Sequence, residues 1–94
     1  MDVLRPYISD HSVVVFGKPG CTECHRLESW MNDNRTIYLK VDVAKLDEED
    51  VDVVVPALKS VSKLTQYPFC FFDGISMTSE ELRTTITMQP DHDF

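Results

Sequence analysis

The spacing of apolar residues changes along the first half of the chain, and the change predicts a strand followed by a helix. Residues 13–16 read VVVF, a continuous β-favouring run typical of a central strand buried on both faces. The segment GKPG at 17–20 interrupts this run. Apolar side chains then recur at spacings of three and four, which predicts a helix beginning near Cys21. The stripe on that helix consists of Cys24, Leu27, Trp30 and Met31.

A second strand is expected after this helix. Asn-Asp-Asn at 32–34 stops the helix, and the segment from Thr36 to Val43 then alternates. One face of the predicted strand carries Ile37, Leu39 and Val41, and the other carries Tyr38 and Lys40. Strand, helix and strand in succession predict a parallel pair with a right-handed crossover.

The middle of the chain carries conflicting signals. The run from 47 to 55 begins with acidic residues suited to a helix N-terminus but contains four valines, which favour strand. Residues 44–55 are therefore left unassigned, and the acidic run is taken as a solvated loop or helix start. Pro56 suits a first helical turn, and apolar residues follow it at helical spacing. This predicts a helix over 56–65.

The last part of the chain predicts a hairpin and a helix. Residues 68–72 form a strand, Asp73-Gly74 a tight turn, and residues 75–77 the returning strand. Thr78 and Glu81, three residues apart, form a capping box that opens a final helix ending before Pro90.

A short helix near Pro6 is also expected in the opening segment 3–9. The order of elements is a βαβ half followed by a ββα half, which predicts an α/β fold with a four-stranded mixed sheet flanked by helices. A chain of 94 residues supports one core, so residues 1–94 are expected to be a single domain.

Charge and hydropathy exclude several classes of function. The chain has 16 acidic and 9 basic residues, a net charge of −7, and its basic residues do not cluster. This argues against nucleic-acid binding. Neither a membrane-spanning apolar stretch nor a secretory signal is visible. We therefore expect a cytoplasmic protein that is a monomer and does not contact membranes. Because thiols stay reduced in the cytoplasm, the three cysteines are not expected to form a disulfide framework.

Two of the cysteines, Cys21 and Cys24, form a C-x-x-C at the predicted junction of strand, loop and helix, which is the setting of a redox motif. Cys21 at the helix N-terminus would meet free backbone N–H groups and the positive end of the dipole, which favour the thiolate. Lys18 adds a positive charge on the same loop. Glu23 opposes these effects, and we expect it to be outweighed as a solvated carboxylate. Cys24, one turn later, is the natural resolving thiol.

The same residues allow other chemistry. CTECH is also the attachment motif of c-type haem, with His25 as axial ligand. A zinc site would need two further ligands beside the cysteines, and the histidines show no paired spacing, so no metal site is predicted. Cys70, between two phenylalanines, is expected to be an inert core residue. Pro68 is compatible with a cis Tyr67–Pro68 bond or with a trans proline on an edge strand.

The runs VVVFGKPGCTEC and QYPFCFFDG resemble the glutaredoxin family of the thioredoxin superfamily over most of the chain. The resemblance implies a thioredoxin-like fold and a dithiol mechanism in which Cys21 attacks and Cys24 resolves. It implies that Lys18 contacts a carboxylate of glutathione and that Tyr67, before a cis Pro68, holds the ligand by its main chain. An iron–sulfur cluster held by Cys21 and glutathione between two protomers is a further property of the family.

The sequence departs from the family pattern at several positions. Thr22-Glu23 stands in place of Pro-Tyr inside the motif, and Gln66-Tyr67 in place of Thr-Val before the proline. The Gly-Gly pair that usually precedes the cap for the γ-glutamyl group is replaced by Met77-Thr78, which leaves Ser79 and Glu80 as candidates for that cap.

The function expected from the resemblance is reduction of protein disulfides or of glutathione mixed disulfides. The partners would be disulfide-containing proteins, with no tightly bound cofactor and with glutathione as a candidate reductant. The alternative is a binding module that keeps the redox fold for a metal or a protein partner and turns over little.

Overall fold

Among the residues that the structure describes, helices and strands alternate as far as a hairpin of two strands, which a last helix follows. The computed structural model describes residues 3–62 and 66–88. Its elements in chain order are α1 (Arg5–Ile8), β1 (Val13–Gly17), α2 (Thr22–Asp33), β2 (Leu39–Asp42), a 3₁₀ turn (Val43–Lys45), α3 (Glu48–Val61), β3 (Phe69–Phe72), β4 (Ile75–Met77) and α4 (Ser79–Met88).

The four strands form one mixed sheet in the order β2-β1-β3-β4. β1 runs parallel to β2 and antiparallel to β3, and β3 pairs antiparallel with β4. Every residue of β1 is buried, as expected for a central strand covered on both faces. The predicted mixed sheet, built from a βαβ half and a ββα half, is confirmed.

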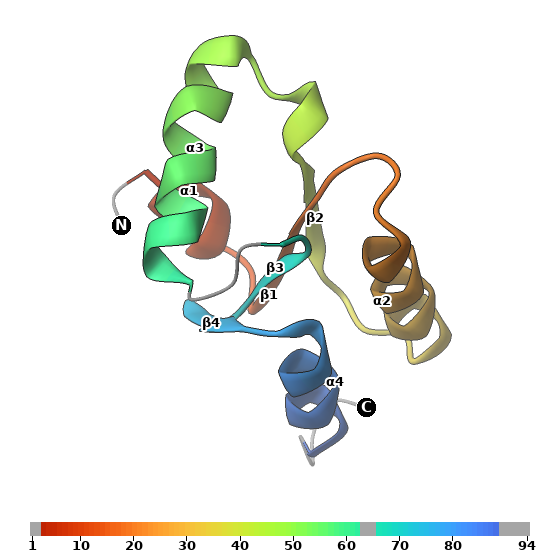
Figure 1. The fold of residues 1–94 in the computed structure, drawn as a ribbon. Coiled ribbons are helices and arrows are strands. Elements are labelled where there is room, and N and C mark those ends of the chain that lie inside the picture. Colours follow the sequence, from red (N-terminus) through yellow and green to blue (C-terminus); the bar gives the residue numbers. More distant parts are fainter. Residues whose placement is uncertain (1–2, 63–65, 89–94) are drawn as a thin grey trace.

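Helices cover both faces of this sheet (Figure 1). α1 and α3 pack on one face, where Val14 and Phe16 of β1 point, and α2 and α4 pack on the other, where Val13 and Val15 point. The side chains buried on the α1–α3 face are Leu4, Val14, Phe16, Val41, Val43, Val54, Leu58, Phe69 and Phe71. Those on the α2–α4 face are Val13, Val15, Leu27, Met31, Cys70, Leu82 and Ile86.

The second strand is shorter than predicted. It begins at Leu39, and Ile37, expected on the same face as Leu39, has 87% of its surface exposed. The register explains the difference, because Leu39 pairs with Val14 and the residue opposite Ile37 would lie before the start of β1. The residues directly after α2 form the turn that ends the helix and not the start of a strand. Arg35 in this turn has a positive φ of 56°.

The unassigned middle segment is largely helical. α3 begins at Glu48, so Pro56 lies inside the helix and not in its first turn as predicted. Three acidic residues in the first turn suit the positive end of the helix dipole, and the buried Val54 and Leu58 are four residues apart. Helical spacing of the apolar residues outweighs the strand propensity of valine here. The helix ends at Val61, with Ser62 as its C-cap, so it stops before the predicted end at 65; residues 63–65 lie outside the described residues.

The hairpin and the last helix follow the prediction. Asp73 and Gly74 both have positive φ, 49° and 82°, as a two-residue hairpin turn requires. In the capping box the Thr78 Oγ1 accepts from the Glu81 N–H at 3.0 Å, and the Glu81 carboxylate accepts from the Thr78 N–H at 2.9 Å. The Tyr67–Pro68 bond is cis, as one of the two alternatives anticipated. Pro90 lies outside the described residues.

The described part of the chain has no helix with both the length and the apolar character needed to span a membrane.

Candidate active site

The predicted cysteine pair lies where β1 leads into α2. Cys21 is the N-cap residue of α2, and its Sγ accepts a hydrogen bond from the backbone N–H of Cys24 at 3.1 Å. The two residues are joined by a disulfide, with their Cα atoms 5.2 Å apart. Cys21 keeps 9% of its surface exposed and Cys24 only 2%. Cys21 is therefore the more exposed of the two residues, and its sulfur is the one that accepts a hydrogen bond at the helix terminus.

Two glycines shape the loop around this pair. Gly20, immediately before Cys21, has a φ of +79°, a conformation that glycine adopts without strain. Gly17 closes β1, and a Cβ atom there would lie 3.2 Å from the Cys24 Sγ. A side chain at residue 17 would press on the disulfide, so the close packing of strand against Cys24 depends on glycine.

Lys18 and Tyr67, predicted to bind substrate, lie together beside the loop. The Lys18 Nζ is 5.1 Å from the centroid of the Tyr67 ring, a cation–π distance. The same ring meets Phe69 edge-on at 4.9 Å between centroids. Partial burial raises the pKa of the Tyr67 phenol, so this group stays neutral near physiological pH. Tyr67 leads directly into Pro68, which is buried.

An open groove of about 740 Å³ adjoins Lys18 and Tyr67 and extends to the start of α3. Its apolar wall comes from Val43, Ala44, Leu46, Val51 and Val55, and Glu48 and Asp52 add two carboxylates. The two cysteines do not line this groove, but Lys18 and Pro19, which do, belong to the loop that leads to Cys21.

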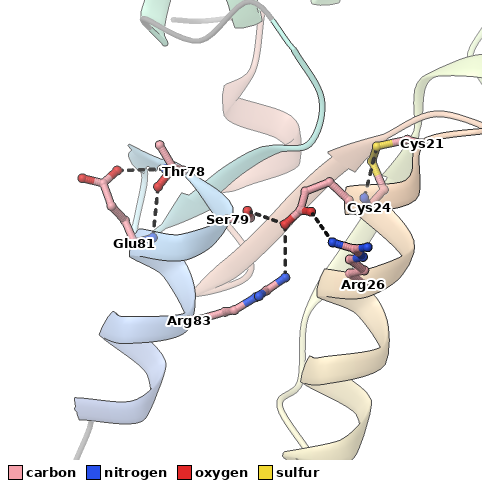
Figure 2. Close-up of polar contacts among 8 residues, drawn as sticks. Cys21, Cys24, Arg26, Thr78, Ser79, Glu81 and Arg83 are labelled. Carbon is pink, nitrogen blue, oxygen red and sulfur yellow. Dashed lines mark hydrogen bonds and ion pairs between the residues drawn. A yellow bond between two sulfur atoms is a disulfide. The ribbon is translucent and has the colours of Figure 1, made fainter.

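Glu23, inside the C-x-x-C, is held by side chains of two helices. Its Oε2 accepts a hydrogen bond from the Ser79 Oγ at 3.2 Å and lies 3.3 Å from the Arg83 Nη2. Its Oε1 lies 3.9 Å from the Arg26 Nη1. Figure 2 shows Ser79 and Arg83 of α4 directed toward the first turn of α2, close to the cysteines. Glu23 is thus paired with two guanidinium groups, which was not predicted, while its side chain stays 44% exposed, in keeping with the solvated carboxylate that was expected.

The two residues proposed as a γ-glutamyl cap have different surroundings. The Ser79 hydroxyl is engaged by Glu23, whereas the exposed Glu80 lines a separate hollow with residues of β4 and the outer side of α4. Sequence reasoning did not find Arg26 and Arg83. Arg26 follows Glu23 at a spacing of three and Arg83 follows Ser79 at four, so each pair shares a helix face. The contact between α2 and α4 brings the two pairs together, and no pattern of neighbouring residues in the sequence predicts that contact.

The third cysteine is confirmed as a core residue. Cys70 in β3 is fully buried, and burial raises the pKa of its thiol to about 12. His25, the axial ligand of the haem alternative, is exposed on α2. Within residues 3–62 and 66–88, no three His, Cys, Asp or Glu side chains gather into a group able to hold a metal ion.

The family of the chain is indicated by comparison with known proteins. A family model described as glutaredoxin matches residues 13–76, which is more than half of the chain and includes the disulfide and the Tyr67–Pro68 bond. Curated protein sequences give no significant match.

Solved structures of similar fold are glutaredoxins. A buckwheat glutaredoxin in complex with glutathione superposes with a TM-score of 0.77 at 18% identity, covering 92% of this chain and 77% of that one. The holo form of glutaredoxin C1 from Populus tremula x tremuloides gives 0.75 at 21% identity, with coverage of 93% and 88%. The glutaredoxin grx-1 of Archaeoglobus fulgidus gives 0.70 at 19%, with coverage of 86% and 91%. These likenesses confirm the thioredoxin-like fold.

Proposed function

The chain belongs to the glutaredoxin family, and from this premise we propose that it is a thiol–disulfide oxidoreductase that reduces protein disulfides and mixed disulfides of glutathione. The observation that carries the proposal is the Cys21–Cys24 pair at the start of α2. The hydrogen bond from the Cys24 N–H to the Cys21 Sγ supplies a donor to the sulfur on which negative charge must be stabilised. The helix dipole acts in the same direction.

The proposed reaction begins with the reduced pair. The Cys21 thiolate attacks one sulfur of the substrate disulfide, a Cys21–substrate disulfide forms, and the leaving thiolate takes a proton from solvent. Cys24 then loses its proton and attacks the Cys21 Sγ, which releases the second substrate thiol. The substrate gains two electrons and two protons, and the enzyme is left with the Cys21–Cys24 disulfide that the structure contains.

Reduction of the Cys21–Cys24 disulfide back to two thiols needs two electrons, which two thiol molecules supply. We propose glutathione as the reductant, two molecules being oxidised to one glutathione disulfide for each turnover, with no tightly bound cofactor. The glutathione present in the buckwheat glutaredoxin supports this choice. The proposal includes a cytoplasmic location, where such thiols are abundant and proteins rarely keep structural disulfides.

Substrate is proposed to bind along the groove between the Cys21 loop and α3. Tyr67 would offer its backbone to an extended peptide, and Lys18 would attract a carboxylate of glutathione. The position of the Lys18 ammonium over the Tyr67 ring supports a shared role of the two residues, because both line the same groove.

The proposal is tested by steady-state kinetics on two substrates, a peptide–glutathione mixed disulfide and a protein disulfide. Electrons are supplied either by glutathione with its reductase or by thioredoxin reductase. Wild type should reduce both substrates with glutathione as the electron source. Cys21→Ser should lose both activities, because the attacking thiolate is gone. Cys24→Ser should lose reduction of the protein disulfide but keep turnover of the mixed disulfide, which needs only one thiol.

Cys70→Ala serves as the control, since it removes a cysteine that lies outside the reaction. It should keep both activities. A wild type that turns over neither substrate would show that the chain is a binding module and not a reductase, and a fully active Cys21→Ser variant would show that Cys21 is not the attacking thiol.

A further inference from the structure

Glu23 is the one charged side chain between the two cysteines of the motif, and α4 holds it by a hydroxyl and a guanidinium. We infer that Glu23 is a specificity-determining residue that makes the enzyme discriminate, among disulfides of proteins and peptides, against those with an acidic side chain next to the reacting cysteine. The inference rests on the proposed function, since it concerns which disulfides Cys21 accepts.

The first argument is that the donors near the start of α4 already hold an anion. Ser79 is the first residue of α4, and its hydroxyl donates to the Glu23 Oε2, the same oxygen that pairs with Arg83. A hydroxyl at a helix N-terminus and a guanidinium one turn later on the same helix are well suited to bind a carboxylate. Here that carboxylate comes from the chain itself, and a substrate carboxylate must displace it or share its partners.

The second argument is the balance of charge around this contact. Glu80 and Glu81 add two carboxylates in the first turn of α4. Both line the hollow on the outer side of α4, so the charges directly beside the motif are the Glu23 carboxylate and the guanidinium groups of Arg26 and Arg83 that it occupies. Glu81 is committed to the cap of its own helix, where it accepts from the Thr78 N–H. Because Glu23 occupies the guanidinium groups and the chain as a whole carries a net charge of −7, an anionic substrate approaches against the field of the molecule, whereas a neutral or basic one does not.

The third argument is distance along the motif. Glu23 is two residues from Cys21, and Figure 2 places Cys21 at the end of α2 that Ser79 and Arg83 face. A substrate charge one residue from the attacked sulfur comes within roughly one Debye length of the Glu23 carboxylate. The Debye length is about 8 Å at physiological salt. Because the Glu23 and Arg83 side chains are 44% and 32% exposed, water weakens the effect without removing it.

The test uses three peptides, each with one cysteine joined by a disulfide to a small neutral thiol. The peptides differ only in the residue next to this cysteine, which is Glu, Gln or Lys. The quantity measured is kcat/KM for each peptide, and the readout is the ratio of the Glu peptide to the Gln peptide within one enzyme. Any change in the Cys21 thiolate or in folding affects both peptides and cancels in this ratio. Wild type should prefer Lys and Gln over Glu.

Glu23→Gln, which keeps the shape and removes the charge, should raise the Glu-to-Gln ratio roughly two- to five-fold, the size of one screened ion pair. The gain should shrink at high salt. In the double variant Glu23→Gln with Arg83→Gln the gain should disappear, because the freed guanidinium is what attracts the substrate carboxylate.

Asp33→Asn is the matched control. It removes one negative charge from the same helix, at the exposed opposite end of α2, and should leave the ratio unchanged. An unchanged ratio in Glu23→Gln, or an equal rise in Asp33→Asn, would overturn the inference while leaving the proposed function intact. Failure of wild type to reduce any of the three peptides would overturn the proposed function and this inference with it.

Discussion

The three cysteines have the same kind of side chain but lie in different surroundings. Cys21 caps a helix and accepts a backbone hydrogen bond, Cys24 packs against Gly17 at the end of β1, and Cys70 lies inside the sheet among apolar side chains. A thiol needs a stabilised anion and access to solvent to react, and only the first of these positions provides both. These surroundings support the proposed attack by Cys21 and resolution by Cys24, and they make Cys70 a core residue.

Cys70 should resist alkylation in the folded protein. With a pKa of about 12, its thiol is protonated at pH 8, and its side chain is buried, so both the thiolate and access to it are lacking. Iodoacetamide added to the reduced protein at pH 8 should leave Cys70 unmodified while Cys21 reacts. Peptide mass mapping checks this, and unfolding in urea should make Cys70 reactive. Alkylation of Cys70 at the same rate in both conditions would contradict its buried place.

The positions of the two motif cysteines at the start of a helix were predictable from the sequence because their evidence is local. A strand, a glycine-rich break and a helix start lie within a dozen residues, and spacing alone puts Cys21 at the helix terminus. The partners of Glu23 were not predictable in this way. Ser79 and Arg83 lie 56 and 60 residues further along the chain, and only the packing of α2 beside α4 brings them to the motif.

At the scale of elements, α3 shows where pattern and propensity disagree. Valines at 51, 54 and 55 favour strand by type, but their spacing, continued by Leu58, lies along one side of a helix. The acidic first turn favours the helix at its start, and Pro56, which suggested a beginning, lies in the interior. The position of the proline misled the prediction because proline is common in first turns and costly elsewhere.

Pro56→Ala should stabilise the protein. The substitution restores a backbone donor in the interior of α3 and removes the clash of the proline ring, worth up to about 3 kcal/mol in free energy of unfolding. Pro6→Ala is the matched control, because Pro6 lies in the first turn of α1, where proline is tolerated and the change should stay within about 1 kcal/mol. Urea denaturation of both variants measures the difference. A lower midpoint for Pro56→Ala would mean that the helix depends on this proline.

At the scale of the whole molecule, the fold follows from the order of its elements and from the two-sided burial of β1. A buried central strand needs helices on both faces of the sheet. Helices α1 and α3 cover one face and helices α2 and α4 the other, each pair packing against one of the two core clusters. This arrangement was predictable from the sequence, since connection rules leave few alternatives for a βαβ followed by a hairpin and a helix. The limits of β2 were not, because they depend on where β1 begins in the shared register.

The same architecture explains the placement of the site. The loop from β1 brings Cys21 to the start of α2, while Tyr67 leads into Pro68 and β3, the antiparallel neighbour of β1. Two segments distant in sequence thus meet at one end of adjacent strands, with the Lys18 ammonium over the Tyr67 ring.

The central claim is that Cys21 attacks the substrate and Cys24 releases it, and trapping of the intermediate tests it most directly. Reduced Cys24→Ser and Cys21→Ser variants are each mixed with a protein disulfide, quenched with acid and analysed by mass spectrometry without reductant. Cys24→Ser should accumulate an adduct with the mass of enzyme plus substrate, linked through Cys21, because no thiol remains to resolve it. Cys21→Ser should give none. An adduct linked through Cys24 in the Cys21→Ser protein, or none in either variant, would contradict the assignment.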